Sequence, residues 1–463
     1  MLQKSMRKLL SLSEKYSKYL IAAVIVFVVL LPKFPMIKVP GTYVSIRFED
    51  VLMLLLGISL IPKFILDFKS IFKDKVAASI LIFFGVALLS VLTGYLVSDT
   101  VDLKIGILHW ARRIEYIIPF LAIYLLTPRE KIKENLIFYF KVLVIVVVIS
   151  FFYGLGQRYL KLPVIITQNE EYSKGIALRW TPGAHINSTF AGHYDLSAFM
   201  VLTLPIFIGG IFLIKDKLVK IALALTSGMG LWLLINSISR TAQATYLFAV
   251  TVALFLSKKF KGWILVAFIS VVFMFLSSGL DARFTRAIKV LYEHFTTGES
   301  FSYVPKFRIM AEDELPVKTQ TPTSVPVAEK IKDVSISIRY NVEWPRAIRA
   351  FIKNPILGTG YSSIGLATDN DYLRMLGETG ILGLASFVLI FLHIGKKFFQ
   401  VFLIREKLDG FEKTFLFGMI GGVLGILATA VLIDLFEASK LAIMLWLLLG
   451  CSVSLVNYKL NEK

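Results

Sequence analysis

Long apolar stretches separated by short polar segments run along most of this 463-residue chain. A helix needs about 20 apolar residues to cross the roughly 30 Å hydrocarbon core of a bilayer. Stretches near that length recur twelve times, so the pattern predicts an all-α polytopic membrane protein. The predicted spans are 18–35, 49–66, 76–98, 105–126, 136–156, 195–214, 218–236, 240–257, 263–278, 377–394, 415–435 and 438–456.

Lysine and arginine gather in alternate connections of this twelve-span arrangement, as well as at the N-terminus. The basic segments are 4–18, 63–75, 129–133, 215–220, 258–261 and 396–413. Such residues concentrate in cytoplasmic loops, so we expect both termini to be cytoplasmic. The chain then divides into nine spans at 1–278 with an outer loop at 157–194, a large extracytoplasmic loop at 279–378, and three spans at 379–463.

Composition supports a membrane protein and narrows its chemistry. Hydrophobic residues make up 56% of the chain and charged residues only 18%, against about 25% charged in soluble proteins. We attribute most of the net charge of +19 to topology and not to nucleic-acid binding. The single cysteine, Cys451, falls inside the last predicted span, which excludes a disulfide and a cysteine metal site.

Two groups of ionisable residues stand at the outer ends of early spans. Such residues are costly at membrane depth unless they are paired or face water. We interpret them as pairing with each other near the interface. They are Arg47, Glu49 and Asp50 in the second span, and Arg112, Arg113 and Glu115 in the fourth.

The two outer loops carry most of the remaining polar residues. The loop at 157–194 is rich in Pro, Gly, Asn and Ser, which predicts irregular coil, and its His185 and His193 lack a third metal ligand at a recognisable spacing. In the large loop, 281–296 predicts an amphipathic helix and 299–332 is interrupted by prolines. A further helix at 335–353 carries Arg339 and Arg346 on one face.

Arg240 follows a very short turn between the seventh and eighth spans, so it must lie at the membrane boundary near a helix start. An arginine beside the unpaired N–H groups of a helix N-terminus suits an anion. A snorkelling interfacial arginine gives the same pattern. Downstream, Asp369 and Asn370 open the helix that becomes the tenth span.

Several short motifs occur here in a fixed order: STFAGHYD, SRTAQATYL, RYNVEWPRAI, NPILGTG and DNDYLRMLGETG. Over roughly 181–384 the chain resembles the O-antigen ligase and O-antigen polymerase superfamily of GT-C-type membrane glycosyltransferases. The resemblance implies extracytoplasmic transfer of a glycan from undecaprenyl diphosphate to an acceptor hydroxyl, at the cytoplasmic (inner) membrane. It implies no cofactor, nucleotide sugar or metal.

By motif, Arg240 and Arg339 correspond to the arginines thought to hold the diphosphate. Arg346, Asn370 and His193 are further candidates for binding the diphosphate or the glycan. Ligases commonly have a histidine at the position of Asp369, and that histidine is the proposed base. Many polymerase-like members have an aspartate there, as this chain does. We therefore consider Asp369 either as the general base or as a helix N-cap.

Two other classes of function compete with glycan transfer. A flippase for a lipid-linked glycan also needs many spans and cationic cavities, although transporters usually bind near the bilayer midplane and show internal repeats. An accessory scaffold of an envelope complex would leave the outer arginines without a role. The acceptor, whether a second lipid-linked glycan, lipid A core, a protein or a wall polymer, is not specified by the sequence.

Overall fold

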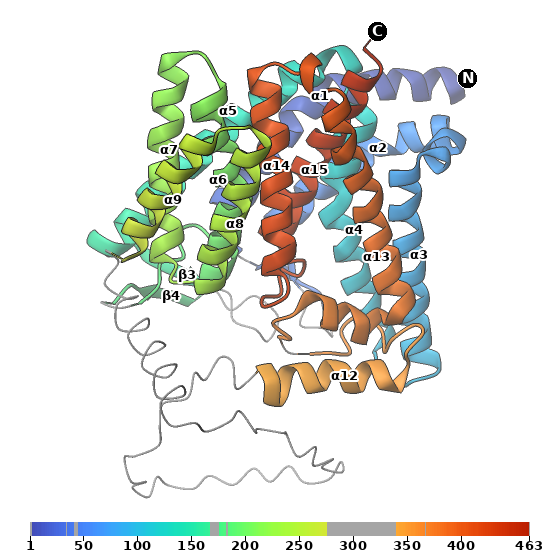
Figure 1. The fold of residues 1–463 in the computed structure, drawn as a ribbon. Coiled ribbons are helices and arrows are strands. Elements are labelled where there is room, and N and C mark those ends of the chain that lie inside the picture. Colours follow the sequence, from blue (N-terminus) through green and yellow to red (C-terminus); the bar gives the residue numbers. More distant parts are fainter. Residues whose placement is uncertain are drawn as a thin grey trace, which may run out of the picture.

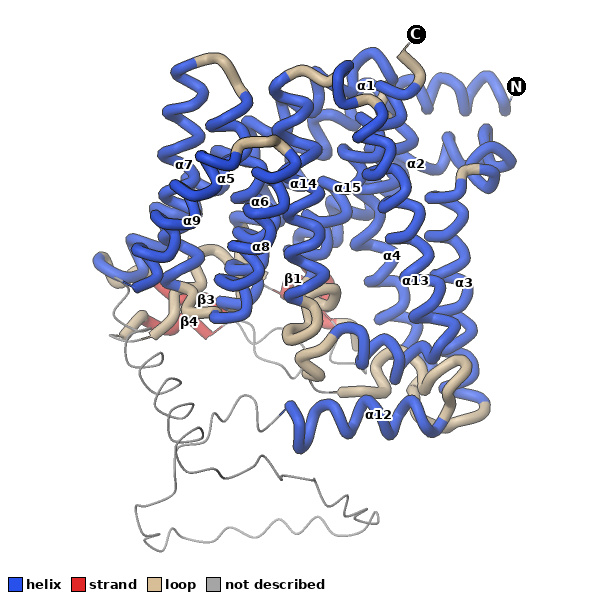
Figure 2. Tube along the Cα trace, viewed as in Figure 1, coloured by secondary structure: helices blue, strands red, loops and turns tan. Residues whose placement is uncertain are grey.

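A computed structural model describes residues 2–33, 35–40, 45–166, 176–181, 184–275, 339–365 and 367–462. Long helices run roughly side by side and form a bundle (Figures 1 and 2). The predicted segments 281–296 and 299–332 lie outside the described residues, as does the start of 335–353. Short turns join several of the described helices, such as α2 to α3 and α7 to α8.

Except for the amphipathic α12, the helices coincide with the apolar stretches of the sequence, because a helix satisfies the backbone polar groups of such a stretch with its own hydrogen bonds. They are α1 (Leu2–Leu30), α2 (Phe48–Lys73), α3 (Lys75–Leu96), α4 (Leu103–Leu126), α5 (Ile132–Tyr159), α6 (His193–Leu213), α7 (Lys217–Asn236), α8 (Arg240–Leu256), α9 (Phe260–Phe275), α12 (Trp344–Lys353), α13 (Asp371–Leu403), α14 (Gly410–Thr429) and α15 (Ser439–Leu460).

Among the described residues, eight helices are long and apolar enough to cross a membrane: α2, α3, α5 with the short helix before it, α6, α7, α13, α14 and α15. The apolar helices α8 and α9 are shorter. The chain is thus a multi-pass membrane protein. The count of twelve spans stays a prediction.

Two β-hairpins correct the all-helical prediction. The strands β1 (Pro35–Lys38) and β2 (Ser45–Arg47) pair antiparallel, as do β3 (Pro163–Ile166) and β4 (Ile176–Arg179). The irregular coil predicted for 157–194 is therefore wrong in part. Strands of three or four residues are too short to produce a clear alternation of polar and apolar positions.

The centre of the bundle is formed by α6, α14 and α15, whose side chains are mostly buried. Glycines of α14 allow its backbone to approach its neighbours closely. A Cβ at Gly421 would lie 2.2 Å from the Ala249 oxygen on α8, and one at Gly422 would lie 2.6 Å from the Leu202 oxygen on α6. Such small-residue contacts are the usual means of close helix packing in membranes.

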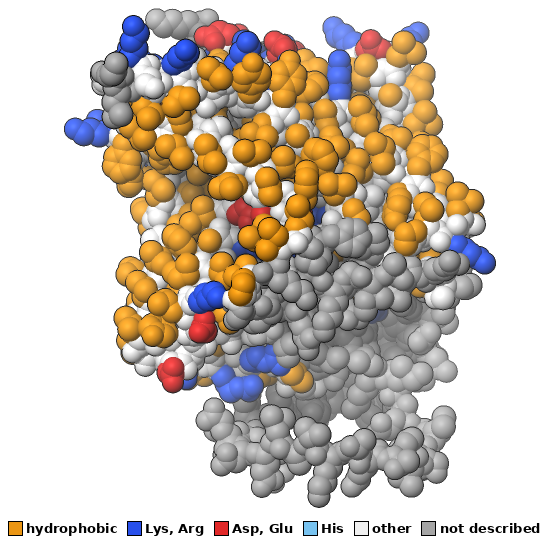
Figure 3. All heavy atoms as spheres, turned by 180° about the vertical axis from the view of Figure 1, so that it is seen from behind, with side chains coloured by type: hydrophobic (Ala, Val, Ile, Leu, Met, Phe, Trp, Pro, Cys, Tyr) orange, Lys and Arg blue, Asp and Glu red, His pale blue; other side chains and the backbone are white. Residues whose placement is uncertain are grey.

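The two ends of the bundle differ. Both termini lie at one end, together with the basic α6–α7 and α13–α14 connections, whereas α12 lies across the opposite end (Figure 1). A broad band of hydrophobic side chains covers the face between them, with most Lys and Arg near the ends (Figure 3). The structure groups the basic connections with the termini, while the membrane side that each end faces stays a prediction.

The segment after α12 docks on a break in α13. Gly380 has a left-handed φ of +66°, so the helical conformation is interrupted there. The NPILGTG segment supplies partners for backbone groups at the break. Four hydrogen bonds join the two: Thr359 N to Gly377 O (3.0 Å), Gly360 N to Glu378 O (2.8 Å), Ile381 N to Pro355 O (2.9 Å) and Leu382 N to Ile356 O (3.2 Å). This contact fixes α12 relative to the start of α13.

Candidate functional site

An ion pair joins two of the predicted site residues, Arg339 and Asp369. Arg339 opens a five-residue π turn (Arg339–Glu343) that leads into α12, and Asp369 lies just before α13. The Arg339 Nε and Nη2 atoms donate to the same Asp369 oxygen, Oδ2, at 3.0 and 2.8 Å. The side chains are 11% and 24% exposed. The pair is therefore well shielded but reachable from the surface.

Asp369 does not cap α13, so the capping alternative is wrong. The N-cap is Asn370, whose side-chain oxygen accepts from Leu373 N at 2.9 Å. Asp369 itself has a left-handed φ of +48°, whereas an N-cap residue usually has an extended backbone. Its backbone turns the carboxylate toward Arg339. Asn370, predicted to bind substrate, is buried with its side-chain oxygen committed to the cap.

The turn that holds Asp369 is fixed by a second turn between α14 and α15. The Asp434 carboxylate accepts from Thr368 N at 2.8 Å, from Asn370 N at 3.0 Å and from Arg374 Nη1 at 3.1 Å. In return, Asp371 accepts from the backbone N–H groups of Leu435 and Phe436. Carboxylates that accept several backbone N–H groups hold a loop firmly. The position of Asp369 is thus set from both sides.

Burial raises the pKa of Asp369, the Arg339 guanidinium opposes this change, and the nearby Asp434 adds to it; the net direction is upward. Arg339 donates from Nε and Nη2 to one oxygen, and its Nη1 atom forms no hydrogen bond with the described residues. The pair thus leaves one edge of the guanidinium without a partner among the described residues. This edge faces away from the Asp369 contact, because the guanidinium is planar.

Sequence reasoning missed a neighbour of this pair, Glu343. Its Oε2 atom is buried and accepts no hydrogen bond from the described residues, and the same lack of a partner holds for Trp344 Nε1 and Arg346 Nη1. Burial raises the pKa of Glu343 to about 7, aided by Asp369 and Asp434 and opposed by Arg339 and Arg346. Buried polar atoms without partners are rare in native proteins and often mark a functional site. No motif distinguishes Glu343 in the sequence.

Arg240 begins α8 as predicted, after the cap residue Ser239. It lines a cavity of about 230 Å³ between the first turns of α8 and the end of α9. The cavity is otherwise mostly apolar: its lining also includes Gln243, Ala244, Leu247, Val271, Met274 and Phe275. Much of α9 is exposed on its outer side. A charged group thus lies at one end of an apolar space near the lateral surface of the bundle.

His193, the remaining predicted substrate-binding residue, is the first residue of α6. Its ring stacks on His185 at a centroid distance of 3.8 Å and on Tyr194 at 4.0 Å. The structure therefore gives His193 an aromatic stacking arrangement. Its part in binding a glycan stays a prediction.

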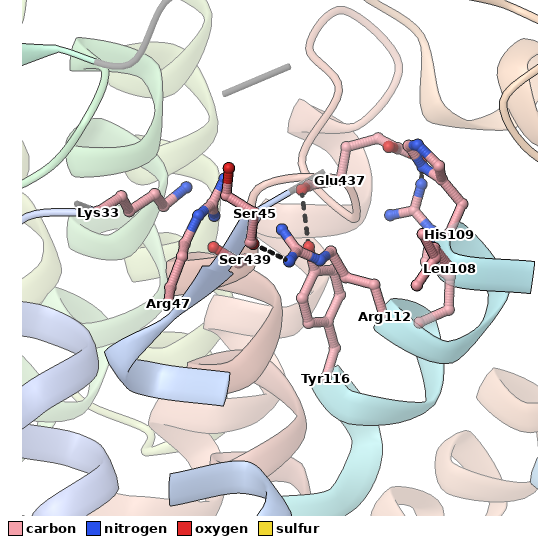
Figure 4. A pocket seen from close by; sticks show the side chains of 10 residues that line it. Lys33, Ser45, Arg47, Leu108, His109, Arg112, Tyr116, Glu437 and Ser439 are labelled. Carbon is pink, nitrogen blue, oxygen red and sulfur yellow. Dashed lines mark hydrogen bonds and ion pairs between the residues drawn. The ribbon is translucent and has the colours of Figure 1, made fainter. Parts of the chain in front are cut away.

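A separate polar cavity confirms in part the pairing predicted for the early ionisable residues (Figure 4). Lys33, Arg47, Arg112 and Arg113 line it with Glu437. The ion pairs around it are Arg47 with Glu49 (3.8 Å), Arg112 with Asp50 (3.2 Å), Lys33 with Asp195 (3.6 Å) and Arg113 with Glu437. Arg113 thus pairs with a residue from the far end of the chain and not with Asp50 or Glu49.

The profile of the O-antigen ligase family matches residues 221–388. This match covers less than half of the chain and supports its resemblance to the O-antigen ligase and polymerase superfamily. The matched range holds Arg240, Glu343, the Arg339–Asp369 ion pair and the Gly380 break, whereas the polar cavity of Figure 4 lies largely outside it. No curated protein matches the chain.

The match supports an enzyme that transfers glycans in the manner of an O-antigen ligase. The matched residues also meet in space. The segment from Arg339 to α12 and the start of α13 contact each other through the ion pair and the docking hydrogen bonds, so the three motifs between Arg339 and Gly380 form one structural unit.

Proposed function

We propose that the chain transfers a glycan from an undecaprenyl-diphosphate carrier to an acceptor hydroxyl, as a polymerase or a ligase. The observation that carries this proposal is the Arg339 guanidinium, which Asp369 orients while leaving one edge for an anion. The family match supports glycan transfer, and the orientation of Arg339 by Asp369 supports a role for this guanidinium as the cation that meets the leaving group.

The bond between the anomeric carbon and the diphosphate oxygen breaks during transfer, and negative charge grows on the diphosphate. A guanidinium that is already oriented stabilises this charge without reorganising at the moment of reaction. Arginine suits the task because its planar fork matches phosphate oxygens. Asp369 acts here by holding the Nε and Nη2 atoms of Arg339, so that Nη1 meets the diphosphate.

The cavity at Arg240 suits the carrier lipid. Undecaprenyl diphosphate combines an anionic head with a long apolar chain, and the cavity combines Arg240 with apolar walls from α8 and α9. The exposed apolar side chains of α9 leave this region facing lipid. We propose that Arg240 binds the diphosphate near the membrane boundary while the first isoprene units lie against Leu247, Val271 and Met274.

Both sites belong to the extracytoplasmic side in this proposal, because the basic connections gather at the opposite end with the termini. The acceptor is then a glycan, lipid A core or other envelope molecule outside the cytoplasmic membrane. No metal or cofactor takes part, since the arginines stabilise the diphosphate charge.

The test is glycosidic bond formation by purified protein. Wild-type protein with lipid-linked donor and a candidate acceptor should give a new glycan product by mass spectrometry, and the yield should persist in EDTA. Loss of product in EDTA that divalent metal restores would contradict metal independence. Movement of the lipid-linked glycan across a vesicle bilayer without any new bond would favour the flippase alternative and overturn this proposal.

A further inference from the structure

We infer that Glu343 is the general base that accepts the proton of the acceptor hydroxyl. This inference rests on the proposed glycan transfer and assigns a role that the motif-based expectation gave to Asp369. It starts from the placement of Glu343, which ends the turn that Arg339 begins. Residues four apart on a helical turn project from the same face, so Glu343 lies beside the proposed diphosphate ligand.

The other carboxylates in this region already have partners. Asp369 Oδ2 accepts two hydrogen bonds from Arg339, Asp371 accepts from two backbone N–H groups, and Asp434 accepts from Thr368, Asn370 and Arg374. Glu378 is buried and its Oε1 atom accepts no hydrogen bond from the described residues, but this atom lies 3.7 Å from Arg374 Nε and forms an ion pair with it. A carboxylate in a tight pair with a guanidinium is a weak base, because the cation stabilises its ionised form.

Glu343 differs from Asp369, Asp434 and Glu378 because none of the described residues forms an ion pair with it. Its Oε2 atom is shielded from solvent yet receives no hydrogen bond from the described residues. Two N–H donors beside it in the chain, Trp344 Nε1 and Arg346 Nη1, also lack partners there. A hydroxyl-rich substrate supplies both donors and acceptors, so a sugar bound at this turn would satisfy all three atoms.

The charged groups that act on Glu343 come from three places: Arg339 and Arg346 on its own turn and helix, Asp369 before α13, and Asp434 before α15. Burial and the two aspartates outweigh the two arginines, so the pKa of Glu343 rises to about 7. A general base works best when its pKa lies near the working pH. Glu343 is therefore ionised in part at neutral pH and binds a proton readily.

In the proposed transfer step, the acceptor hydroxyl gives its proton to Glu343 Oε2 while its oxygen forms a bond to the anomeric carbon. The bond from that carbon to the diphosphate oxygen breaks, and its electron pair leaves with the diphosphate, which Arg339 and Arg240 stabilise. Glu343 then releases the proton to solvent and returns to the carboxylate.

The test compares Glu343→Gln, Glu343→Asp and the control Glu406→Gln in purified protein with lipid-linked donor. Glu406 is an exposed glutamate in a short helical turn at the other end of the bundle. We expect kcat to fall about 100-fold in Glu343→Gln, the lower end of the usual contribution of a base, because the diphosphate leaves easily. The rise of kcat with pH toward neutrality should vanish in this variant, persist in Glu343→Asp at a reduced rate, and remain unchanged in Glu406→Gln.

Stability provides a readout that needs no activity. The folded protein keeps a proton on Glu343 up to about pH 7, whereas the unfolded chain loses it near its ordinary value of 4.5. Folding stability from this group is therefore lost as pH rises between those values. The melting temperature of Glu343→Gln should equal that of wild type at pH 4.5 and exceed it at pH 8.

Each outcome has one meaning. A near-wild-type kcat in Glu343→Gln overturns the assignment and leaves glycan transfer intact. A fall in rate with an unchanged pH profile assigns Glu343 to substrate binding and also overturns it. If wild-type protein forms no glycosidic bond, both the proposed function and the role of Glu343 as base fail. If the difference in melting temperature between Glu343→Gln and wild type does not grow with pH, the raised pKa of Glu343 is contradicted independently of activity.

Discussion

At the scale of single residues, the geometry of the Arg339–Asp369 ion pair indicates that Asp369 orients Arg339 and does not act as the base. Both hydrogen bonds reach one carboxylate oxygen of Asp369, so the carboxylate orients the guanidinium. When a residue only orients a catalytic group, its replacement by a close analogue lowers the rate less than loss of a base does. The pH dependence of the rate is also kept. This gives a direct way to separate an orienting Asp369 from a catalytic base.

We expect Asp369→Asn to lower kcat about tenfold, because a neutral hydrogen bond to a charged partner is weaker by roughly 1 to 1.5 kcal/mol than a charged one. The pH profile should keep its rise toward neutrality. Arg339→Ala should cost about 100- to 1,000-fold, the usual loss of one donor to a developing anion. Arg339→Lys should recover little, since lysine lacks the planar fork.

Steady-state kinetics of these variants at several pH values would check the assignment. If Asp369→Asn abolishes the pH dependence and Glu343→Gln leaves it intact, Asp369 is the base and Glu343 is not. Asp369→His is a further comparison, because it restores the histidine that ligases commonly have before the asparagine. Under the orienting role, this variant loses the ion pair with Arg339 and should be slower than Asp369→Asn.

The sequence predicted these residues to different degrees. Arg240, Arg339 and Asp369 stand in recognisable motifs, so the sequence identified them as site residues without showing how they are arranged in space. Glu343 has no such signal, because its properties come from burial and from charges contributed by α13 and the α14–α15 turn. Asn370 was assigned to substrate, yet its buried side chain caps α13. Burial and partner choice depend on how distant segments meet.

At the scale of elements, the contact between NPILGTG and the α13 break sets the position of α12. Gly358 and Gly380 both have left-handed φ angles, +71° and +66°. A Cβ at either glycine would lie 2.4 Å from the backbone of the other segment. Two backbones thus meet where no side chain fits, and the site residues on the α12 segment are placed through this contact.

Gly380→Ala should therefore destabilise the protein by about 1 to 2 kcal/mol from the left-handed backbone alone, and overpacking should add about 1 to 3 kcal/mol. Gly365→Ala is the matched control, because a Cβ there meets nothing within 4 Å and its φ is not left-handed. Thermal unfolding in detergent should show a lower melting temperature for Gly380→Ala only. Equal melting temperatures would mean that the break yields without cost.

Hydropathy predicted the helices well because a membrane span has a strong signature of length and composition. It placed the start of the tenth span at residue 377, whereas α13 begins at Asp371. The first turns of α13 carry three buried charged residues: Arg374 forms ion pairs with Glu378, Asp434 and Glu437, and Asp371 accepts hydrogen bonds from backbone N–H groups of the α14–α15 turn. Paired charged residues lower the hydropathy of a helix, so the apolar span begins later than the helix, whose start was predicted at Asp369 and Asn370.

At the scale of the whole molecule, the basic connections and both termini share one end, and α12 covers the other. Glycan transfer outside the cytoplasm requires the α12 end to be extracytoplasmic. The arrangement of lysines and arginines indicates this orientation, and single-cysteine labelling tests it. The only native cysteine, Cys451, is buried, so a Cys451→Ala background leaves no competing thiol.

In that background, Ile352→Cys places a thiol on α12, where the native side chain is 67% exposed, and Glu406→Cys places one between α13 and α14. A membrane-impermeant maleimide added to intact cells should label Ile352→Cys and leave Glu406→Cys unlabelled until the membrane is opened. Labelling of both after opening is the control for reactivity. The reverse pattern in intact cells would put Arg339, Glu343 and Asp369 in the cytoplasm, where a nucleotide-sugar donor would be available, and the lipid-linked donor would lose its main support.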